Sequence, residues 1–515
     1  MTVSRPSAAD LDAAAEHFGF RLDAAEREEY LAAVRRALHS YDVVDELYAV
    51  LAHPTIPDRV YRVPGRDENP LGAWYVTASI ASGDHGPLAG RTVAVKDNIA
   101  VAGIPMMNGS RAVEGFVPAR DATVVERLLA AGATIAGKSV CEDLCCSGSS
   151  FTSASGPVRN PWDPSREAGG SSSGSAALVA AGEVDLALGG DQGGSIRIPA
   201  ALCGVVGYKP THGLVPYTGA FPIERTIDHL GPITRTVADA ALMLTVLAGP
   251  DGLDPRQPDG IAAVDYRAAL DRDVAGLRVG VLVEGFGQPG AEPGVDALVR
   301  ATAQRFTEIG CAVADVSVPW HRPAAHVLKV VITDGVAYQM LDGNGYGLGV
   351  EGLYDPELMA HFARRRTATA DDLAASVKEK ALCGHYGVTG LGGASYAKAR
   401  NLVPHVRAGY DAALDRYDVL VMPTVPGTAG TLPAGRPRDV ALLDHAGGKS
   451  VNTAPMNLTG HPAVSVPAGL VDGLPAGIMI MGRRFDDATV LQLAAALESL
   501  SGGLPRRPAL RVRPA

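Results

Sequence analysis

The sequence predicts an α/β fold, and three observations support that prediction. From about residue 89 onward, short apolar runs alternate with helical segments, which is typical of a sheet covered by helices. Of the 515 residues, 47% are hydrophobic and 20% charged, as in an ordinary globular protein with a large core. No apolar stretch approaches the roughly 18 residues of a membrane span. The chain also opens without the apolar run of a signal peptide.

The net charge and the number of cysteines argue against several classes of protein. The net charge is −10 and no Lys/Arg cluster stands out, so we expect no nucleic-acid partner and no membrane surface. Six cysteines in a chain of this length do not form a disulfide framework. The sequence therefore predicts a reduced, cytoplasmic protein.

The N-terminal part is expected to be helical. Residues 7–50 are rich in Ala, Leu and Glu, with apolar residues every three to four positions. Residues 52–75 carry four prolines and many charges, which predicts a linker or a surface arm.

The first half of the core alternates strands and helices. We expect a helix that is capped by Asp121 and ended by Gly132, and a second helix ended by Gly182. Strands are expected in the apolar runs RTVAVK, ATIAGK and VDLALGG.

The second half repeats this pattern around a more helical stretch. Residues 328–405 contain few strand-like runs and predict an inserted helical subdomain. Strands are expected in GLRVGVLVE, DVLVMPT, AVSVPAG and AGIMIMG, and a helix after Asp486.

Three short motifs suggest other chemistry, and their context argues against each. GATIAGKS, Gly132 to Ser139, matches the phosphate-loop pattern, but a phosphate loop follows a strand and opens a helix, and here the order is reversed. GSSSG places Ser172 at the nucleophile position of G-x-S-x-G, but no strand precedes it. CEDLCC lacks a second ligand pair at zinc spacing, so we predict buried cysteines and no metal.

The stretch from 169 to 199 is the strongest candidate site. It contains two Gly-Gly-Ser loops, at Ser171 and Ser195, each expected to open a helix, with a strand between them. Helix N-termini offer unpaired N–H groups, and glycines let the backbone approach a ligand. The segment from Gln192 to Ser195 would therefore present several N–H groups to one anionic oxygen.

A serine nucleophile needs a base, and this stretch contains no histidine. Lysine is the alternative base in Ser-Lys hydrolases. Lys96 ends an apolar strand and is the candidate, although a lysine at a strand end is more often solvated.

These residues resemble the amidase signature family of Ser–Ser–Lys amide hydrolases. The matching segments run from about residue 85 to 500 and agree in order and spacing. They are KDNI, GGSSSGSAALVA, GGDQGGSIRIPA, CGVVGYKPTHGLVP, DHLGPITR, DVLVMPT and NLTGHPAVSVPAG. The resemblance implies a large mixed central β-sheet covered by helices, with an N-terminal helical extension and a small inserted helical subdomain.

The resemblance also implies roles for individual residues. Lys96 matches the base, Ser171 the bridging serine and Ser195 the nucleophile. The peptide bond between Gly170 and Ser171 is cis in the family. The N–H groups of Gln192, Gly193, Gly194 and Ser195 match the oxyanion hole, and Asp191 and Arg197 are expected to support the loop.

Within the family, the DQGGSIRIPA segment and the N-terminal extension look most like the Rhodococcus-type enantioselective amidases associated with nitrile hydratase. Ser173 stands where glycine is usual, and Gln192 where Thr, Ile or Val is usual. Cys146 replaces a phenylalanine of those relatives, so Cys146 and Gln192 are the candidate residues of the acyl pocket.

The implied activity is hydrolysis of aliphatic and aromatic primary amides to the acid and ammonia, with enantioselectivity as a further expectation. The relay needs an uncharged Lys96, a form that burial favours. No cofactor is implied, and the partners are a small-molecule amide and a second copy of the chain, as a homodimer. An aryl acylamidase, carbamate or hydrazide hydrolase of the same family remains open. So does a partner-dependent amidotransferase component.

The expected domain organisation follows from these patterns. Residues 1–80 would form the N-terminal helical domain and linker. Residues 81–330 would form the first part of the catalytic core, 331–405 the small helical subdomain, and 406–515 the last part of the core.

Overall fold

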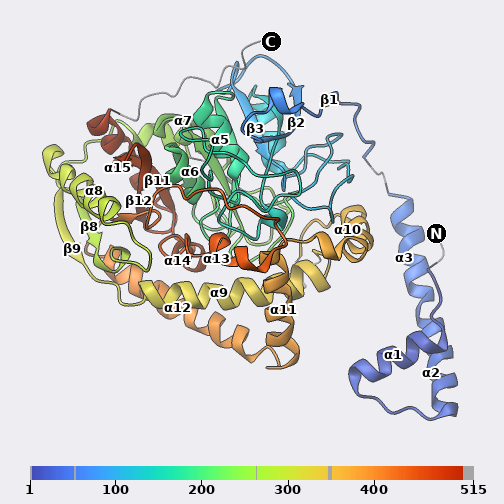
Figure 1. The fold of residues 1–515 in the computed structure, drawn as a ribbon. Coiled ribbons are helices and arrows are strands. Elements are labelled where there is room, and N and C mark those ends of the chain that lie inside the picture. Colours follow the sequence, from blue (N-terminus) through green and yellow to red (C-terminus); the bar gives the residue numbers. More distant parts are fainter. Residues whose placement is uncertain (1–2, 52–53, 263, 346–350, 503–515) are drawn as a thin grey trace. The chain divides into compact units, whose positions relative to one another are not determined.

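A computed structural model of the chain describes residues 3–51, 54–262, 264–345 and 351–502 (Figure 1). The chain divides into two compact units, Met1–Ile56 and Pro57–Ala515. None of the helices in the described residues is long and apolar enough to cross a membrane.

The described residues of the unit Met1–Ile56 form three helices, which confirms the helices predicted for residues 7–50. They are α1 (Ala8–Phe18), α2 (Ala24–Ala37) and α3 (His39–Ala49). The side chains of Ser7 and Asp23 accept hydrogen bonds from backbone N–H groups in the first turns of α1 and α2. In turn, the carboxylates of Asp10 and Glu26 accept the backbone N–H groups of Ser7 and Asp23, which completes a capping box at each helix. Local sequence therefore fixes where these helices begin.

In the part of the unit Pro57–Ala515 that the structure describes, 12 strands form one mixed sheet. Their order across the sheet is β1-β2-β4-β3-β5-β7-β6-β11-β12-β10-β8-β9. The strands are β1 (Tyr61–Arg62), β2 (Trp74–Ile80), β3 (Thr92–Lys96), β4 (Thr134–Ser139), β5 (Leu186–Asp191), β6 (Val206–Lys209), β7 (His229–Thr234), β8 (Arg278–Leu282), β9 (Ala312–Val316), β10 (Val419–Pro423), β11 (Ala463–Val471) and β12 (Leu474–Gly482). β4, β3 and β5 run parallel, as do β10, β8 and β9, and antiparallel strands join the two groups.

Helices accompany this sheet in the order that the sequence alternation predicts. They are α4 (Thr123–Ala130), α5 (Ser173–Ala181), α6 (Arg197–Cys203), α7 (Val237–Leu247), α8 (Pro293–Gln304), α9 (His321–Gly335), α10 (Pro356–Ala368), α11 (Ala375–Thr389), α12 (Ala394–Leu414), α13 (Leu443–Ala446), α14 (Ala454–Thr459) and α15 (Asp487–Ser501). α9 continues into a π-helix, Val336–Asp342, and packs against α11 and α12 (Figure 1). The helical character predicted after residue 328 is therefore present.

Most of the described residues between 54 and 70 are exposed and irregular, as predicted for a surface arm, but the range also includes β1 and the start of β2, both of which belong to the sheet. One local prediction was wrong. Asp121 was expected to cap α4, but its carboxylate instead pairs with Arg59 (2.7 Å) and accepts the N–H of Ala102 (2.7 Å). A charged partner distant in the sequence outcompeted the local cap.

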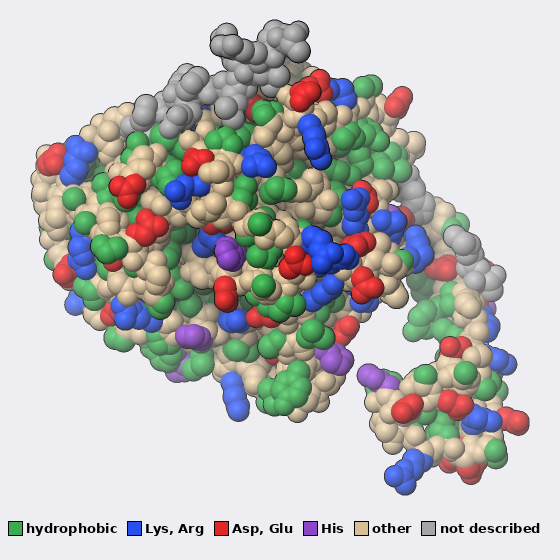
Figure 2. All heavy atoms as spheres, viewed as in Figure 1, with side chains coloured by type: hydrophobic (Ala, Val, Ile, Leu, Met, Phe, Trp, Pro, Cys, Tyr) green, Lys and Arg blue, Asp and Glu red, His purple; other side chains and the backbone are tan. Residues whose placement is uncertain are grey.

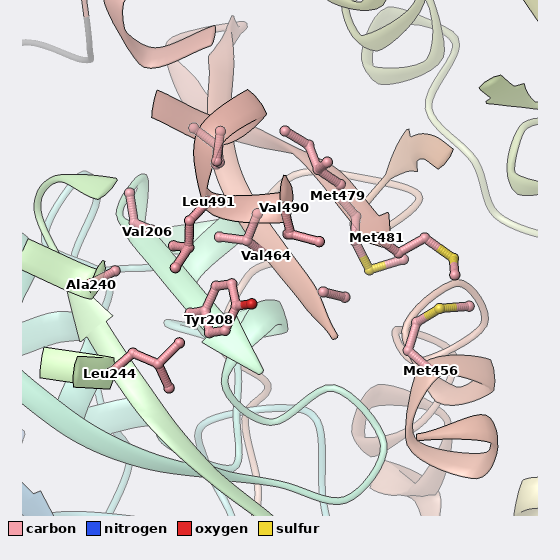
Figure 3. Packing of buried hydrophobic residues seen from close by; sticks show 14 of the residues in the cluster. Val206, Tyr208, Ala240, Leu244, Met456, Val464, Met479, Met481, Val490 and Leu491 are labelled. Carbon is pink, nitrogen blue, oxygen red and sulfur yellow. The ribbon is translucent and has the colours of Figure 1, made fainter. Parts of the chain in front are cut away.

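The core lies between the sheet and its covering helices. In Figure 3 the ring of Tyr208 on β6 lies among side chains from α7, α15 and β11. Its hydroxyl donates to Asp487 Oδ1 (2.9 Å), so the one polar atom of this buried ring is satisfied. Burial of each large apolar side chain contributes about 1.5–3 kcal/mol. On the face shown in Figure 2, basic and acidic side chains are interspersed.

Candidate active site

The site begins at the carboxyl ends of two neighbouring parallel strands. β3 pairs with β5 so that Val95 lies opposite Leu188, and Lys96 is the last residue of β3. β5 ends at Asp191, and the loop that carries Ser195 follows. Parallel strands end at the same edge of a sheet, so Lys96 and this loop are brought to one place.

Both Gly-Gly-Ser loops open helices, as predicted. α5 begins at Ser173, two residues after Ser171, and α6 begins at Arg197, two residues after Ser195. The peptide bond between Gly170 and Ser171 is cis. A side chain at position 170 would place its Cβ 1.9 Å from the carbonyl oxygen of Ser149, so only glycine fits there.

Lys96 is fully buried and contacts the first of these serines. Its Nζ lies 2.7 Å from Ser171 Oγ and donates to the carbonyl of Gly190 at 3.2 Å. Among the described residues no carboxylate forms an ion pair with Lys96, because the adjacent Asp97 pairs with the buried Lys138 at 2.9 Å.

Ser195 lies at the same edge of the sheet, in the loop that follows β5. Its carbonyl accepts the N–H of Ser172 (3.2 Å), and its side chain borders an open cavity. Within the described chain, the hydroxyls of Ser171 and Ser195 share no hydrogen bond. Such contacts are often long before substrate binds.

The backbone N–H groups around Ser195 divide into two kinds. Those of Gln192, Gly193 and Ser195 have no acceptor among the described residues. The N–H of Gly194, by contrast, donates to Asp191 Oδ1 at 2.7 Å. The first three N–H groups are thus available to a ligand, and that of Gly194 is engaged within the loop.

Asp191 organises this loop through a buried network. Its carboxylate accepts both Nε and Nη2 of Arg197 at 3.0 Å, and Oδ1 also accepts Nδ2 of Asn457 at 2.8 Å. Burial by itself would raise the pKa of Asp191, but the charge and hydrogen bonds of Arg197, with Lys209 and Asn457, lower it to about 2. The carboxylate therefore stays ionised and holds the loop with charge-assisted bonds.

The cavity beside Ser195 has a volume of about 540 Å³. Cys146 and Gln192 both line it. Gln192 Nε2 donates to the hydroxyl of Tyr217 (3.2 Å), whose own proton goes to the carbonyl of Phe221 (3.1 Å). The side chain of Gln192 is therefore held in one orientation at the cavity wall.

Other wall residues were not singled out by sequence reasoning. Leu328 and Ile332 come from α9, residues 446–451 supply a Gly-rich rim, and Cys145 lies beside Cys146. Asn457 was missed as a partner of Asp191, although it begins the NLTGHP segment. No local signal marks the α9 residues, because an apolar helix face is also what a core helix presents.

The three rejected motifs have structural roles. Residues 134–139 of the GKS motif form β4 after α4, the reverse of a phosphate loop. Ser172 is fully buried and exchanges hydrogen bonds with the backbone of Gly190. Cys141, Cys145 and Cys146 are buried free thiols.

Comparison with known proteins gives one consistent picture. A family model described as Amidase matches residues 67–491. An enantioselective amidase of Rhodococcus rhodochrous is 56% identical, with 98% of each chain covered. A glutamyl-tRNA(Gln) amidotransferase chain of a Synechococcus strain is 39% identical over 84% of this chain and 87% of its own length. Among solved structures, the native peptide amidase of Stenotrophomonas maltophilia superposes with a TM-score of 0.67 at 31% identity, covering 82% of this chain and 85% of its own.

Proposed function

The chain belongs to the amidase family of amide hydrolases, and we propose that it hydrolyses primary carboxylic amides to the acid and ammonia through Ser195. The observation that carries this proposal is the 2.7 Å contact between buried Lys96 Nζ and Ser171 Oγ, next to the cavity that Ser195 borders. The contact joins an amine and a hydroxyl from two distant parts of the chain, and both residues are fully buried.

In the first step Ser195 Oγ attacks the amide carbon and loses its proton. The proton passes through the hydroxyl of Ser171 to the amine of Lys96, which must be uncharged to accept it. Lys96 is completely buried, and the neighbouring carboxylate of Asp97 is engaged by Lys138.

The oxyanion that forms in this step needs donors that are already in place. The unengaged N–H groups of Gln192, Gly193 and Ser195 would supply them, and each such donor is typically worth about 2.7–4 kcal/mol in the transition state. We assign the N–H of Gly194, predicted from the resemblance as a fourth donor, to the support of the loop by Asp191.

The remaining steps use the same relay in reverse. Lys96 returns the proton through Ser171 to the leaving nitrogen, the C–N bond breaks and ammonia departs. Water then attacks the acyl-Ser195 ester and gives a proton through Ser171 to Lys96. The bond between the acyl carbon and Ser195 Oγ breaks, Lys96 returns the proton through Ser171 to Oγ, and the carboxylic acid is released. No step requires a metal or an organic cofactor.

For the substrate we propose aliphatic and aromatic primary amides, with discrimination between enantiomers. The cavity of about 540 Å³ has room for an aromatic acyl group. Apolar side chains of α9, Leu328 and Ile332, contribute one part of its wall, and Gly447 and Gly448 another. A cavity with branched apolar side chains on one part of its wall and glycines on another supports a preference between mirror-image acyl groups.

We also propose that the active protein is a homodimer of the cytoplasm. The unit Met1–Ile56 exposes large apolar side chains, which are Phe18, Phe20, Tyr41, Val44, Leu47 and Val50. A second copy would remove this apolar surface from water. All six cysteines are free, as suits a reducing compartment. Light scattering is expected to give twice the mass of one chain; a monomeric mass would contradict the dimer.

Ammonia release from propionamide and benzamide tests the proposed activity. We expect release by the full-length protein and none by Ser195→Ala. The matched control is Ser465→Ala, which removes a buried hydroxyl on β11 whose partner is Thr424. This control should keep most of the activity. If the unaltered protein released ammonia only from glutamine and only with partner proteins, the amidotransferase alternative would replace this proposal.

A further inference from the structure

The protein has a second cavity, separate from the one that Ser195 borders. Its volume is about 90 Å³, and most of its lining comes from the segments 217–225, 253–256 and 353–359. Among the described residues, none lines both cavities. The second cavity is therefore a distinct place for a ligand, and the proposed mechanism does not use it.

Arg225 brings an unpaired positive charge to the second cavity. Its Nη1 is buried and has no hydrogen-bond partner among the described residues, none of which offers the guanidinium a carboxylate within ion-pair distance. Its Cζ lies 5.6 Å from the ring centre of Tyr354, which also lines the cavity, so the guanidinium lies at the cavity wall. A buried donor without an acceptor costs free energy, and the cost is greater for a charged group. An anionic oxygen in the cavity would therefore bind favourably beside Arg225.

The other charged side chains that line the second cavity already have partners. Asp254 accepts Nε and Nη2 of Arg256 at 2.8 and 2.6 Å, and Nη1 of Arg256 donates to the backbone carbonyl of Arg225 at 3.2 Å. Asp355 is exposed to water and caps α10, because its carboxylate accepts the N–H of Leu358 at 2.8 Å. Among the described lining residues, the side chain of Arg225 is thus the charged group left to receive a counter-ion.

The remaining wall and the volume of the second cavity restrict the anion further. Much of that wall is apolar and includes Met106, Phe116 and Phe221, each at most 7% exposed. A cavity that holds benzene measures about 150 Å³, and the share of one water molecule in the liquid is about 30 Å³. The 90 Å³ of the second cavity is therefore too small for an aromatic acid. It is sufficient for about three groups of the size of a methyl group or a water molecule.

We propose that the second cavity binds a short aliphatic carboxylate, of which propionate is the example. The two carboxylate oxygens accept N–H groups of Arg225, whose planar guanidinium matches a carboxylate in shape. The ethyl group lies against the apolar wall that Met106 and Phe221 contribute. If the chain hydrolyses short aliphatic amides, as proposed above, this ligand belongs to the same class as the acid product. The site itself does not depend on that reaction.

Methionine methyl groups can report on the second cavity independently of any activity. Met106 and Met359 line it, and no methionine lines the catalytic cavity in the described part of the chain. In the full-length protein with isotope-labelled methionine methyl groups, we expect propionate to shift the NMR signals of Met106 and Met359 until the site is saturated. The signals are assigned with Met106→Leu and Met359→Leu. Butanone, which has nearly the same shape but no charge, and benzoate, which is too large, should leave both signals in place.

Arg225→Gln should weaken the binding of propionate at least about tenfold, because it removes the cation. The backbone bonds of residue 225 to Gln339 and Arg256 can remain in this variant. Lys380→Gln is the matched control, since it removes a cation from the catalytic cavity, and it should leave the propionate shifts unchanged.

Three results would overturn the proposal: no shift of the two signals with propionate, an equal response to butanone or inorganic phosphate, or undiminished binding in Arg225→Gln. If Arg225→Gln does not fold, the comparison of propionate with butanone in the unaltered protein decides. Propionate binding by a protein that releases no ammonia from any amide would support this site and reject the proposed function.

Discussion

Arg197 and Asp191 form an ion pair in which neither side chain is exposed, with Nη2 3.0 Å from Oδ1 and Nε 3.0 Å from Oδ2. The same carboxylate accepts the N–H groups of Gly194 and Ile196, on either side of Ser195. The backbone around the nucleophile is therefore anchored to one buried charge. Because that charge is paired, anchoring does not leave an ion unsatisfied in the core.

Removing this charge should damage both folding and catalysis. Asp191→Asn leaves Arg197 as an unpaired buried cation, and breaking a buried pair typically costs about 3–5 kcal/mol. We expect a lower free energy of unfolding in urea and a kcat that falls with little change in KM, because the N–H groups that receive the oxyanion lose their support. An unaltered urea midpoint and an unaltered kcat would show that the loop around Ser195 keeps its conformation without the charge of Asp191.

Lys96 and Ser171 should act together as one proton relay. Lys96→Ala and Ser171→Ala are each expected to lower kcat for benzamide by on the order of 10³-fold or more, and the double variant by no more than the worse single one. Ser172→Ala, at the next position along the chain, should cost far less. Multiplicative losses in the double variant would indicate that the two groups act independently.

Stability should depend on pH through Asp228. Burial raises the pKa of this carboxyl to about 7, although Arg256 and the N–H of Ile223 act to lower it. Between about pH 4 and 7 the unfolded chain releases a proton that the folded protein keeps, so the free energy of unfolding falls as pH rises through this window.

Asp228→Asn removes that titration. The unfolding free energy of the variant, relative to the unaltered protein, should therefore rise from about pH 4 to about 7 and then level off. The size is on the order of 1.4 kcal/mol per unit of pKa difference. Urea unfolding at pH 4.5, 6 and 8 measures it; a pH-independent difference would contradict the assignment.

Cys146 should control the size of acyl group that the cavity accepts. Phenylalanine at this position fills part of the cavity, so Cys146→Phe is expected to lower kcat/KM for benzamide by about tenfold relative to propionamide. Cys146→Ser, which changes volume little, is the control and should leave the ratio of the two values unchanged. Equal losses for both amides in Cys146→Phe would mean that this wall does not contact the acyl group.

The local pattern of the sequence was enough to place many elements of the sheet, because hydrophobic period and glycine stops act over a few residues. The two Gly-Gly-Ser loops open α5 and α6 as expected, and β5 lies between them. β2 was missed because prolines and charges before Trp74 resemble a linker. The strand is recognisable only by its pairing with β4, a segment about sixty positions away.

Within the candidate site, the sequence determined which groups are present. They are a lysine that ends an apolar strand, two serines that each follow a pair of glycines, and the charged residues Asp191 and Arg197 on either side of the second serine. The sequence did not determine which of them touch. The meeting of Lys96 with Ser171, the engagement of the Gly194 N–H by Asp191, and the exposure of Cys145 to the cavity were decided by the tertiary structure. The physical reason is that each polar group has several possible partners along the chain. Strand register and helix packing then select the one partner that is close enough to form the bond.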